Sequence, residues 1–307
     1  MRKVSSLPLL TAFLLLFMAA SIPVPVHNTL KAEQKKIILL NADTIEGGET
    51  ASNGTPQPFR SVIGNVRFLH GTITLACDRA TEYGAEKKIT LSGNIVITDN
   101  KVEVRADNGV YYPDTEQGEL TGNVRGRMLD GSLIAKAHKA VIEKKNDRIW
   151  LYEDAIAWGK NEQLSGDIIM VHVKESGGAK KKQTIDEVQA HRNALLAARD
   201  TLSTNPRLYN QMSGEKMVIA MTDNAKLSGV TVTGQAESLF HLYNEKNEPS
   251  GINYSSGKII RMFFIDGKLD RVKVTGNVEG KQYPDSYRGN RKINLKKFVW
   301  REQEKPF

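Results

Sequence analysis

The sequence has a single cysteine, Cys77, among 307 residues. One thiol cannot form an intramolecular disulfide, so the fold must be held together by an apolar core and by backbone pairing. Cys77 shares its parity with Ile73 and Leu75 in a stretch that alternates apolar and polar residues. This pattern predicts a small buried side chain rather than a reactive thiol.

Long hydrophobic runs are also lacking. The apolar stretch from Leu7 to Ala20 covers about fourteen residues, whereas a membrane-spanning helix needs roughly twenty. Arg2 and Lys3 precede this stretch and small residues follow it, as in a secretory signal. The sequence therefore predicts a signal peptide over residues 1–27 and an exported protein, with an uncleaved inner-membrane tether as the alternative.

Motifs of enzymes and of metal sites are missing as well. None of the six histidines lies in a zinc-binding spacing, and the sequence has no C-x-x-C pair, nucleophile elbow, phosphate-binding loop or dinucleotide fingerprint. We therefore expect neither catalysis nor a cofactor nor a bound metal.

Acidic residues are fewer than basic ones, 35 against 43, which gives a net charge of +8. Such a balance favours an acidic partner, which is a nucleic acid, an anionic membrane surface or a phosphorylated lipid headgroup. Export argues against nucleic acid. The plain alternative is that the basic residues only keep the surface solvated.

What the sequence does contain is a repeat. Gly64-Asn65-Val66, Gly93-Asn94-Ile95 and Gly122-Asn123-Val124 follow one another at intervals of 29 residues, and Gly276-Asn277-Val278 repeats the motif near the end. Weaker copies occur between them, at Glu153-Asp154-Ala155, Arg192-Asn193-Ala194 and Gly234-Gln235-Ala236.

Apolar residues lie two positions before and two after each glycine, and a period of two predicts a strand. By this parity the glycine faces inward and leaves a gap, while the Asn beside it faces outward. The outward amides are expected to hydrogen-bond along the sheet; a line of carbohydrate-binding groups is the alternative.

A second alternating segment follows each copy, as at Val102, Val104 and Ala106. Turn residues separate the two segments, so the unit is strand, turn, strand, turn. Asp78 and Asp107 follow the second strand of successive units. We interpret them as strand-ending residues that bond to local backbone, not as an acid-base pair.

Residues 184–200 are rich in Ala, Leu, Glu and Arg, a composition that favours a helix. The repeat register places Arg192-Asn193-Ala194 on a strand instead, and we predict a strand. The resulting organisation is a first β block over residues 36–175, a Gly- and Lys-rich loop over 176–183, a second block over 184–284, and a basic tail over 285–307. We expect the tail to be solvated; docking on anionic headgroups and capping of the last strand are the alternatives.

Glycine-asparagine-aliphatic strands joined by short hairpins, as in Thr121-Gly122-Asn123-Val124, Leu91-Ser92-Gly93-Asn94-Ile95 and Tyr209-Asn210-Gln211-Met212-Ser213-Gly214, resemble the OstA-like family of lipopolysaccharide-transport proteins. The resemblance covers roughly residues 36 to 285. It implies an all-β fold, an elongated, twisted, open-edged jellyroll whose apolar interior carries acyl chains. It also implies a periplasmic protein that carries or bridges lipid between the inner and outer membranes.

Expected partners are therefore lipopolysaccharide, through its lipid A acyl chains, and other OstA-like domains that pair through strand edges, with possible self-association. The inward residues of the first units are expected to bind the lipid: Val66, Phe68, Ile73, Leu75, Leu91, Ile95, Ile97, Val102, Val104, Leu120 and Val124. The alternative is a structural envelope β-solenoid or adhesin that uses the same repeats without lipid cargo.

Overall fold

The computed structural model describes residues 37–52, 55–70, 73–84, 86–98, 102–176, 182–222, 226–266 and 268–307. The predicted signal peptide lies outside the described residues, as do Gly71, Asp99, Asn100 and most of the loop predicted at 176–183. The described residues form almost entirely β structure, as the repeat predicted.

Sixteen strands form one antiparallel sheet in which neighbours in sequence are neighbours in space from β3 to β15. The first eight are β1 (Ile37–Asn41), β2 (Thr44–Ser52), β3 (Thr55–His70), β4 (Ile73–Tyr83), β5 (Lys88–Thr98), β6 (Val102–Tyr112), β7 (Gln117–Met128) and β8 (Ile134–Glu143). The others are β9 (Arg148–Trp158), β10 (Glu162–Ser176), β11 (Lys182–Arg199), β12 (Tyr209–Met221), β13 (Leu227–Tyr243), β14 (Pro249–Ile265), β15 (Lys268–Thr275) and β16 (Glu279–Tyr283).

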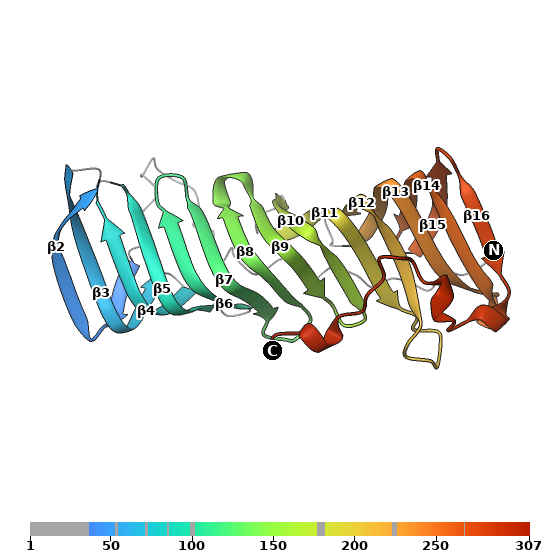
Figure 1. The fold of residues 1–307 in the computed structure, drawn as a ribbon, viewed down its shortest axis with the longest axis horizontal. Helices are drawn as coiled ribbons and strands as arrows, with labels where there is room; N and C mark the ends of the chain where they lie inside the picture. The colour runs from blue at the N-terminus through green and yellow to red at the C-terminus, as the bar shows by residue number, and fades with distance from the viewer. Residues whose placement is uncertain are drawn as a thin grey trace.

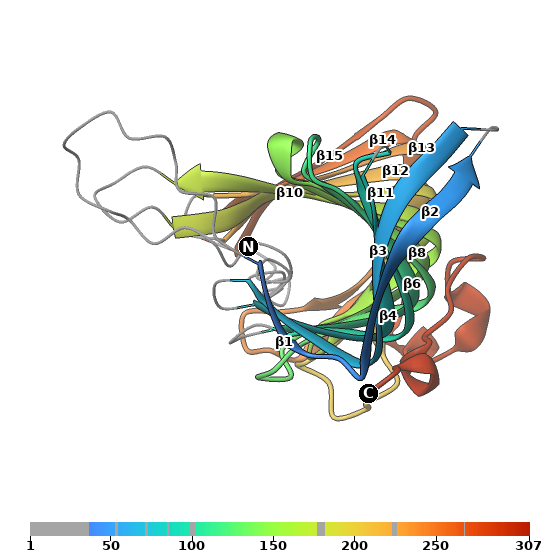
Figure 2. The same cartoon turned by 90° about the vertical axis from the view of Figure 1, so that its left-hand side faces the viewer.

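The sheet is elongated along its stacking direction and curls into an open C-shaped section, the jellyroll that the sequence predicted (Figures 1 and 2). One core cluster of apolar side chains from β3 to β14 lines the inside of the curl. Four short 3₁₀ helices are described: η1 (Lys144–Asn146), η2 (Asp285–Tyr287), η3 (Arg291–Ile293) and η4 (Glu302–Glu304).

The segment that composition favoured as a helix is strand β11, as the repeat register predicted. It pairs with β10 over almost its full length, from Glu162 opposite Ala198 to Ser176 opposite Lys182. The pairing overrides local propensity because the segment is central in the sheet and bonded on both sides. The sheet thus runs on from one predicted block to the other without a break.

The Gly-Asn pairs do not continue the strand alternation as predicted. Gly93 and Asn94 both have positive φ, 74° and 47°, and together they oppose the single residue Asp107 on β6. They form a β-bulge that bends the strand, while Leu91 and Ile95 on either side of it both stay in the core. A Cβ atom on Gly93 would collide with the carboxylate of Asp78, whose side chain is exposed. The prediction of an inward gap is therefore wrong, because the glycine faces the outer surface at a corner of the sheet.

Replacement of Gly93 by alanine is expected to lower the free energy of unfolding by about 2 to 3 kcal/mol. About 1 to 2 kcal/mol comes from the left-handed backbone, and the rest from displacing Asp78 out of its hydrogen bond. Gly131→Ala is the matched control, because Gly131 has a similar φ of 73° but nothing within 4 Å of the new Cβ. Urea unfolding of both variants measures the difference, and equal losses would show that the Asp78 contact contributes nothing.

Candidate functional site

The interior of the jellyroll is the first candidate site. Of the residues predicted to bind lipid, most are buried in the core cluster: Val66, Leu91, Ile95, Val102, Val104, Leu120 and Val124. Three are partly buried and pack against that cluster: Phe68, Leu75 and Ile97. Ile73 is half-buried and lies outside it. The structure thus brings ten of the eleven predicted residues into one continuous apolar cluster.

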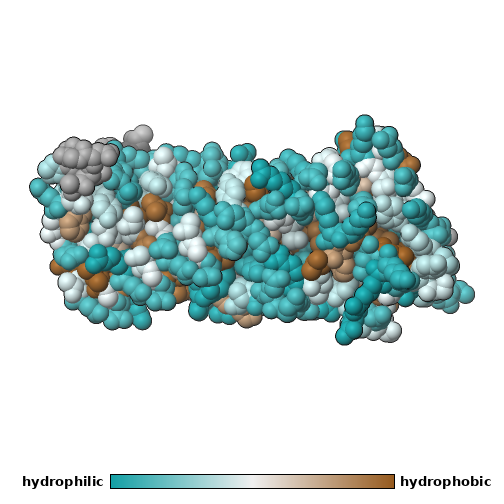
Figure 3. Space-filling model, viewed as in Figure 1, coloured by the Kyte–Doolittle hydropathy of each residue, from teal (hydrophilic) through white to brown (hydrophobic). Residues whose placement is uncertain are grey.

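The interior is most open at its two ends. Some apolar side chains are only partly buried against the core, and these lie near the two ends of the sheet. At one end they are Ala42, which precedes β2, and Val62, Phe68, Leu75, Ile89 and Ile97 on β3 to β5; at the other end they are Phe240, Phe264, Leu269 and Val274 on β13 to β15. The outer surface, by contrast, is mostly hydrophilic on the face that Figure 3 shows, with apolar residues in small separate patches. The apolar path therefore runs lengthwise and reaches both ends of the sheet.

At each end of the sheet, two short strands together take the place of one edge strand. β1 and β2 pair side by side with β3, and β15 and β16 pair with β14. The outer strand at the first end carries exposed apolar residues, with Ile38 50% and Ile45 71% exposed, and bears Glu46 and Glu49. The two strands at the other end, β15 and β16, have more basic than acidic residues: Lys268, Arg271, Lys273 and Lys281 against Asp270 and Glu279. The two free edges therefore have opposite net charge.

A ladder of polar pairs follows the corner formed by the bulges. In four of the units the side-chain amide of the Asn donates to an Asp that precedes it in the chain, with Nδ2 to Oδ distances of 2.7 to 3.2 Å: Asn65 to Asp43, Asn94 to Asp78, Asn123 to Asp107 and Asn193 to Asp167. The amides thus bond along the sheet, as predicted. The interpretation of Asp78 and Asp107 as strand-ending residues is wrong, because both lie inside strands and accept from a side chain.

The basic tail is not solvated as expected. Residues 285–307, which we call the strap, run back along the outside of the sheet from β16 to β6 (Figures 1 and 2). Leu295 is 4% exposed and packs with Leu239 and Ile252 in a second, smaller apolar cluster. Phe298 and Trp300 pack on the ring of Tyr209, at centroid distances of 5.3 and 4.6 Å.

Two buried glutamines clamp the backbone of the strap. Gln163 on β10 donates to the carbonyl of Val299 at 2.7 Å and accepts from the amide of Arg301 at 2.7 Å. Gln211 on β12 accepts from the amide of Leu295 at 3.0 Å. Both residues open a matching sequence, Gln-Leu-Ser-Gly-Asp at 163–167 and Gln-Met-Ser-Gly-Glu at 211–215. This shared pattern is the signal from which the clamp could have been predicted.

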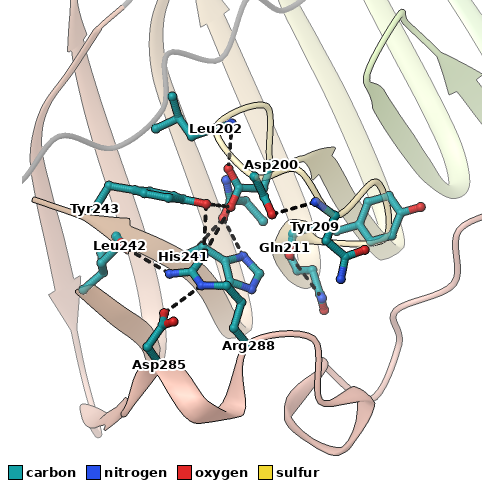
Figure 4. Close-up of polar contacts among 12 residues, drawn as sticks. Asp200, Leu202, Tyr209, Gln211, His241, Leu242, Tyr243, Asp285 and Arg288 are labelled. Carbon is teal, nitrogen blue, oxygen red and sulfur yellow. Dashed lines mark hydrogen bonds and ion pairs between the residues drawn. The ribbon is translucent and has the colours of Figure 1, made fainter. Parts of the chain in front are cut away.

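A buried polar cluster fixes the start of the strap (Figure 4). Arg288 lies against Asp200 at 3.5 Å and donates to the hydroxyl of Tyr243 at 3.0 Å and to the carbonyl of Leu242 at 3.2 Å. Tyr243 in turn donates to Asp200. Burial raises the pKa of Tyr243, and the bond to Asp200 adds to that rise. In the same cluster, burial lowers the pKa of His241 to about 4.

The far end of the strap is held by ion pairs. Arg301 binds both carboxylate oxygens of Asp154, at 2.6 and 2.7 Å, and also pairs with Glu304. Lys136 on β8 reaches Glu304 at 2.6 Å. Because of Arg301 above all, the pKa of Glu304 falls to about 2. Phe307 lies 4.5 Å from the guanidinium of Arg127. The strap thus contacts the sheet from β14 to β6.

Cys77 is 4% exposed, and burial raises the pKa of its thiol to about 11, so the prediction of a small buried side chain is confirmed. Among the described residues, no group of three His, Cys, Asp or Glu side chains is placed to hold a metal ion. Within the same part of the chain, no helix is long and apolar enough to cross a membrane.

Comparison with known proteins gives three findings. Residues 34–139 match the family model described as OstA-like protein. Over 101 residues the chain is 30% identical to the LPS-assembly protein LptD of Pseudomonas fluorescens, a match that covers 33% of this chain and 11% of that protein. A crystal structure of LptH, described as the LptA homologous periplasmic component of the lipopolysaccharide transport device of Pseudomonas aeruginosa, aligns with 50% of this chain and 95% of LptH, with a TM-score of 0.35 and 13% identity.

Proposed function

We propose, on the premise that residues 34–139 are OstA-like, that this protein binds the acyl chains of lipopolysaccharide in its interior and carries them across the periplasm. The observation that carries the proposal is the lengthwise apolar core, whose partly exposed members lie at both ends of the sheet. An apolar lining with few polar groups is typical of sites that take apolar ligands.

A position at the mouth of the interior tests this proposal. Phe68 packs against the core while its neighbour Arg67 is exposed on the outside. A photoreactive benzoyl-phenylalanine at Phe68 is expected to crosslink lipopolysaccharide in cells, because it keeps the aromatic ring inside the jellyroll. The same group at Arg67 is the control and is expected to give at least tenfold less product, measured by immunoblotting with an antibody to lipopolysaccharide. Equal labelling at both positions would contradict binding in the interior. A structural solenoid without cargo would give no product at either.

We also propose that the two edges join like domains head to tail. Strands that carry Gly-Asn bulges alternate along the sheet with strands that carry the ladder partners, and β15 leads into Gly276-Asn277. The opposite end begins with Asp43, a ladder partner. Placing β15 of one copy beside β1 and β2 of the next continues both the antiparallel order and this alternation. Unpaired edges recruit strands in this way, and a head-to-tail contact does not close after two copies.

Charge inversion tests the edge contact. Glu46→Lys with Glu49→Lys, and separately Arg271→Glu with Lys273→Glu, are each expected to raise the dissociation constant of self-association at least tenfold, because like charges then face each other. A mixture of the two double variants is expected to associate again through the pair of inverted edges. Sedimentation velocity measures both effects. A mixture that associates no better than either variant alone would contradict the proposed contact.

A further inference from the structure

A cavity of about 540 Å³ lies between the strap and the outer faces of β13 and β14. Its lining includes Gln235, Glu237, Tyr254, Lys258, Asn277 and Lys296. This volume is within the range of small-molecule sites. The cavity is on the outside of the sheet and is separate from the apolar interior, so it is not part of the proposed acyl-binding path.

At this cavity the charged residue of the polar ladder is basic instead of acidic. Where other units place Asp78, Asp107 or Asp167 beside the bulge, the last unit places Lys258 beside Gly276-Asn277. The aliphatic stem of Lys258 lies over Gly276, where an added Cβ would approach its carbons to 2.9 Å. Because Gly276 has no side chain, the stem of Lys258 can pack against its backbone. The ammonium group of Lys258 has no carboxylate of the ladder beside it.

The strap adds further positive charge. Lys296 and Lys297 both line the cavity, and the ammonium of Lys281 lies 5.7 Å from the ring of Tyr254. Lys297 is paired with Glu215 at 3.4 Å. Lys258 and Lys296, by contrast, form no ion pair and no side-chain hydrogen bond within the described part of the chain.

The lining also holds one carboxylate, Glu237, against the three lysines Lys258, Lys296 and Lys297. Both oxygens of Glu237 accept hydrogen bonds, from the hydroxyl of Tyr254 at 2.8 Å and from that of Ser213 at 3.4 Å. The side-chain amides of Gln235 and Asn277 have no described partner in the lining. The cavity thus offers two unpaired ammonium groups and two amide donors to a ligand, a set that suits an anion with several acceptor oxygens.

We propose that this cavity is a binding site for a phosphate group, either free or as the phosphate of a sugar or a glycolipid headgroup. Lys258 and Lys296 provide the charge, and Asn277 and Gln235 donate to the remaining phosphate oxygens. Because Lys296 belongs to the strap and Lys258 to β14, the site is complete only while the strap is docked.

The decisive variant restores the ladder. Lys258→Asp puts an acid beside Asn277, as in the other units, so the variant is expected to stay folded while it repels phosphate. Lys246→Asp is the matched control, because it makes the same charge change at an exposed turn away from the cavity. Isothermal titration calorimetry of the full chain at low salt would use inorganic phosphate and glucose 6-phosphate as soluble probes. Flotation with vesicles that contain a monophosphorylated glycolipid, against pure phosphatidylcholine vesicles, would test the headgroup.

We expect the unmodified protein and Lys246→Asp to bind at least one phosphate probe, and Lys258→Asp to bind it at least tenfold more weakly. Lys296→Glu is expected to weaken binding to a similar degree. Binding of the soluble probes assigns the site to free phosphates or phosphosugars, while binding of the glycolipid vesicles alone assigns it to a headgroup. No binding of any probe, or equal binding by Lys258→Asp and Lys246→Asp, would overturn the site. Neither result would affect the crosslinking from Phe68.

Discussion

Replacement of Arg288 by methionine is expected to lower the free energy of unfolding by about 3 to 5 kcal/mol, because it leaves a buried carboxylate without its cation. The side chain of Asp200 is fully buried and that of Arg288 is 12% exposed, so water cannot take the place of the guanidinium. Methionine fills a similar volume, which limits the loss from packing. Urea denaturation followed by circular dichroism measures the change.

Arg291→Met is the control for this variant. Arg291 also lies in the strap, but it is exposed and its side chain makes no described contact, so a change within about 0.5 kcal/mol is expected. Trp300 packs on Tyr209. Since the chain has three tryptophans, the difference in fluorescence between the protein and its Trp300→Phe variant reports whether the strap detaches before the sheet unfolds. Equal stability of the two variants would contradict the view that the Arg288 cluster anchors the strap.

Acidification from pH 6.5 to 4 is expected to destabilise the protein by roughly 3 kcal/mol through His241 alone. Burial lowers the pKa of this histidine from its usual 6.5 to about 4 in the folded protein. Between these two values the unfolded chain binds a proton that the folded chain does not bind. Stability is therefore highest above pH 6.5, decreases as the pH falls, and has lost the full contribution below about pH 4.

His241→Gln isolates this contribution. Nδ1 of His241 lies 3.3 Å from Oδ1 of Asn210, and a glutamine amide can donate to the same oxygen. Urea denaturation at pH 7.5, 5.5 and 4.5 should give a flatter dependence on pH for the variant than for the unmodified protein. Equal slopes would show that the buried imidazole is not the source. Glu304 also stabilises the folded protein less at acidic pH, but in a lower pH range. Its pKa is near 2 in the folded protein, so this stabilisation is lost as the pH falls from the pKa of the unfolded chain, about 4.5, through about 2.

Much of the fold follows from local pattern. The 29-residue recurrence of Gly-Asn, with apolar residues two positions away on either side, is enough to place the strands and the order in which they pair. It also placed β11 correctly where helix propensity pointed elsewhere. The direction in which the glycines face did not follow from this pattern, because parity counting assumes an extended backbone, whereas Gly93 and Asn94 have the positive φ angles of a bulge.

What the sequence by itself determined is thus the class of fold, the strand order and the apolar side of each strand, since the two-residue period of side chains is a property of the local chain. Tertiary structure alone decided the rest. Arg288 meets Asp200 across 88 positions, and Gln163 meets Val299 across 136; no local periodicity encodes a pairing at such separations. In sequence the strap is a polar, basic tail with no visible partners. Its partners cannot be recognised from the sequence, because they come together only when the sheet is complete. The same closure places Lys296 near Lys258 and creates the proposed phosphate site.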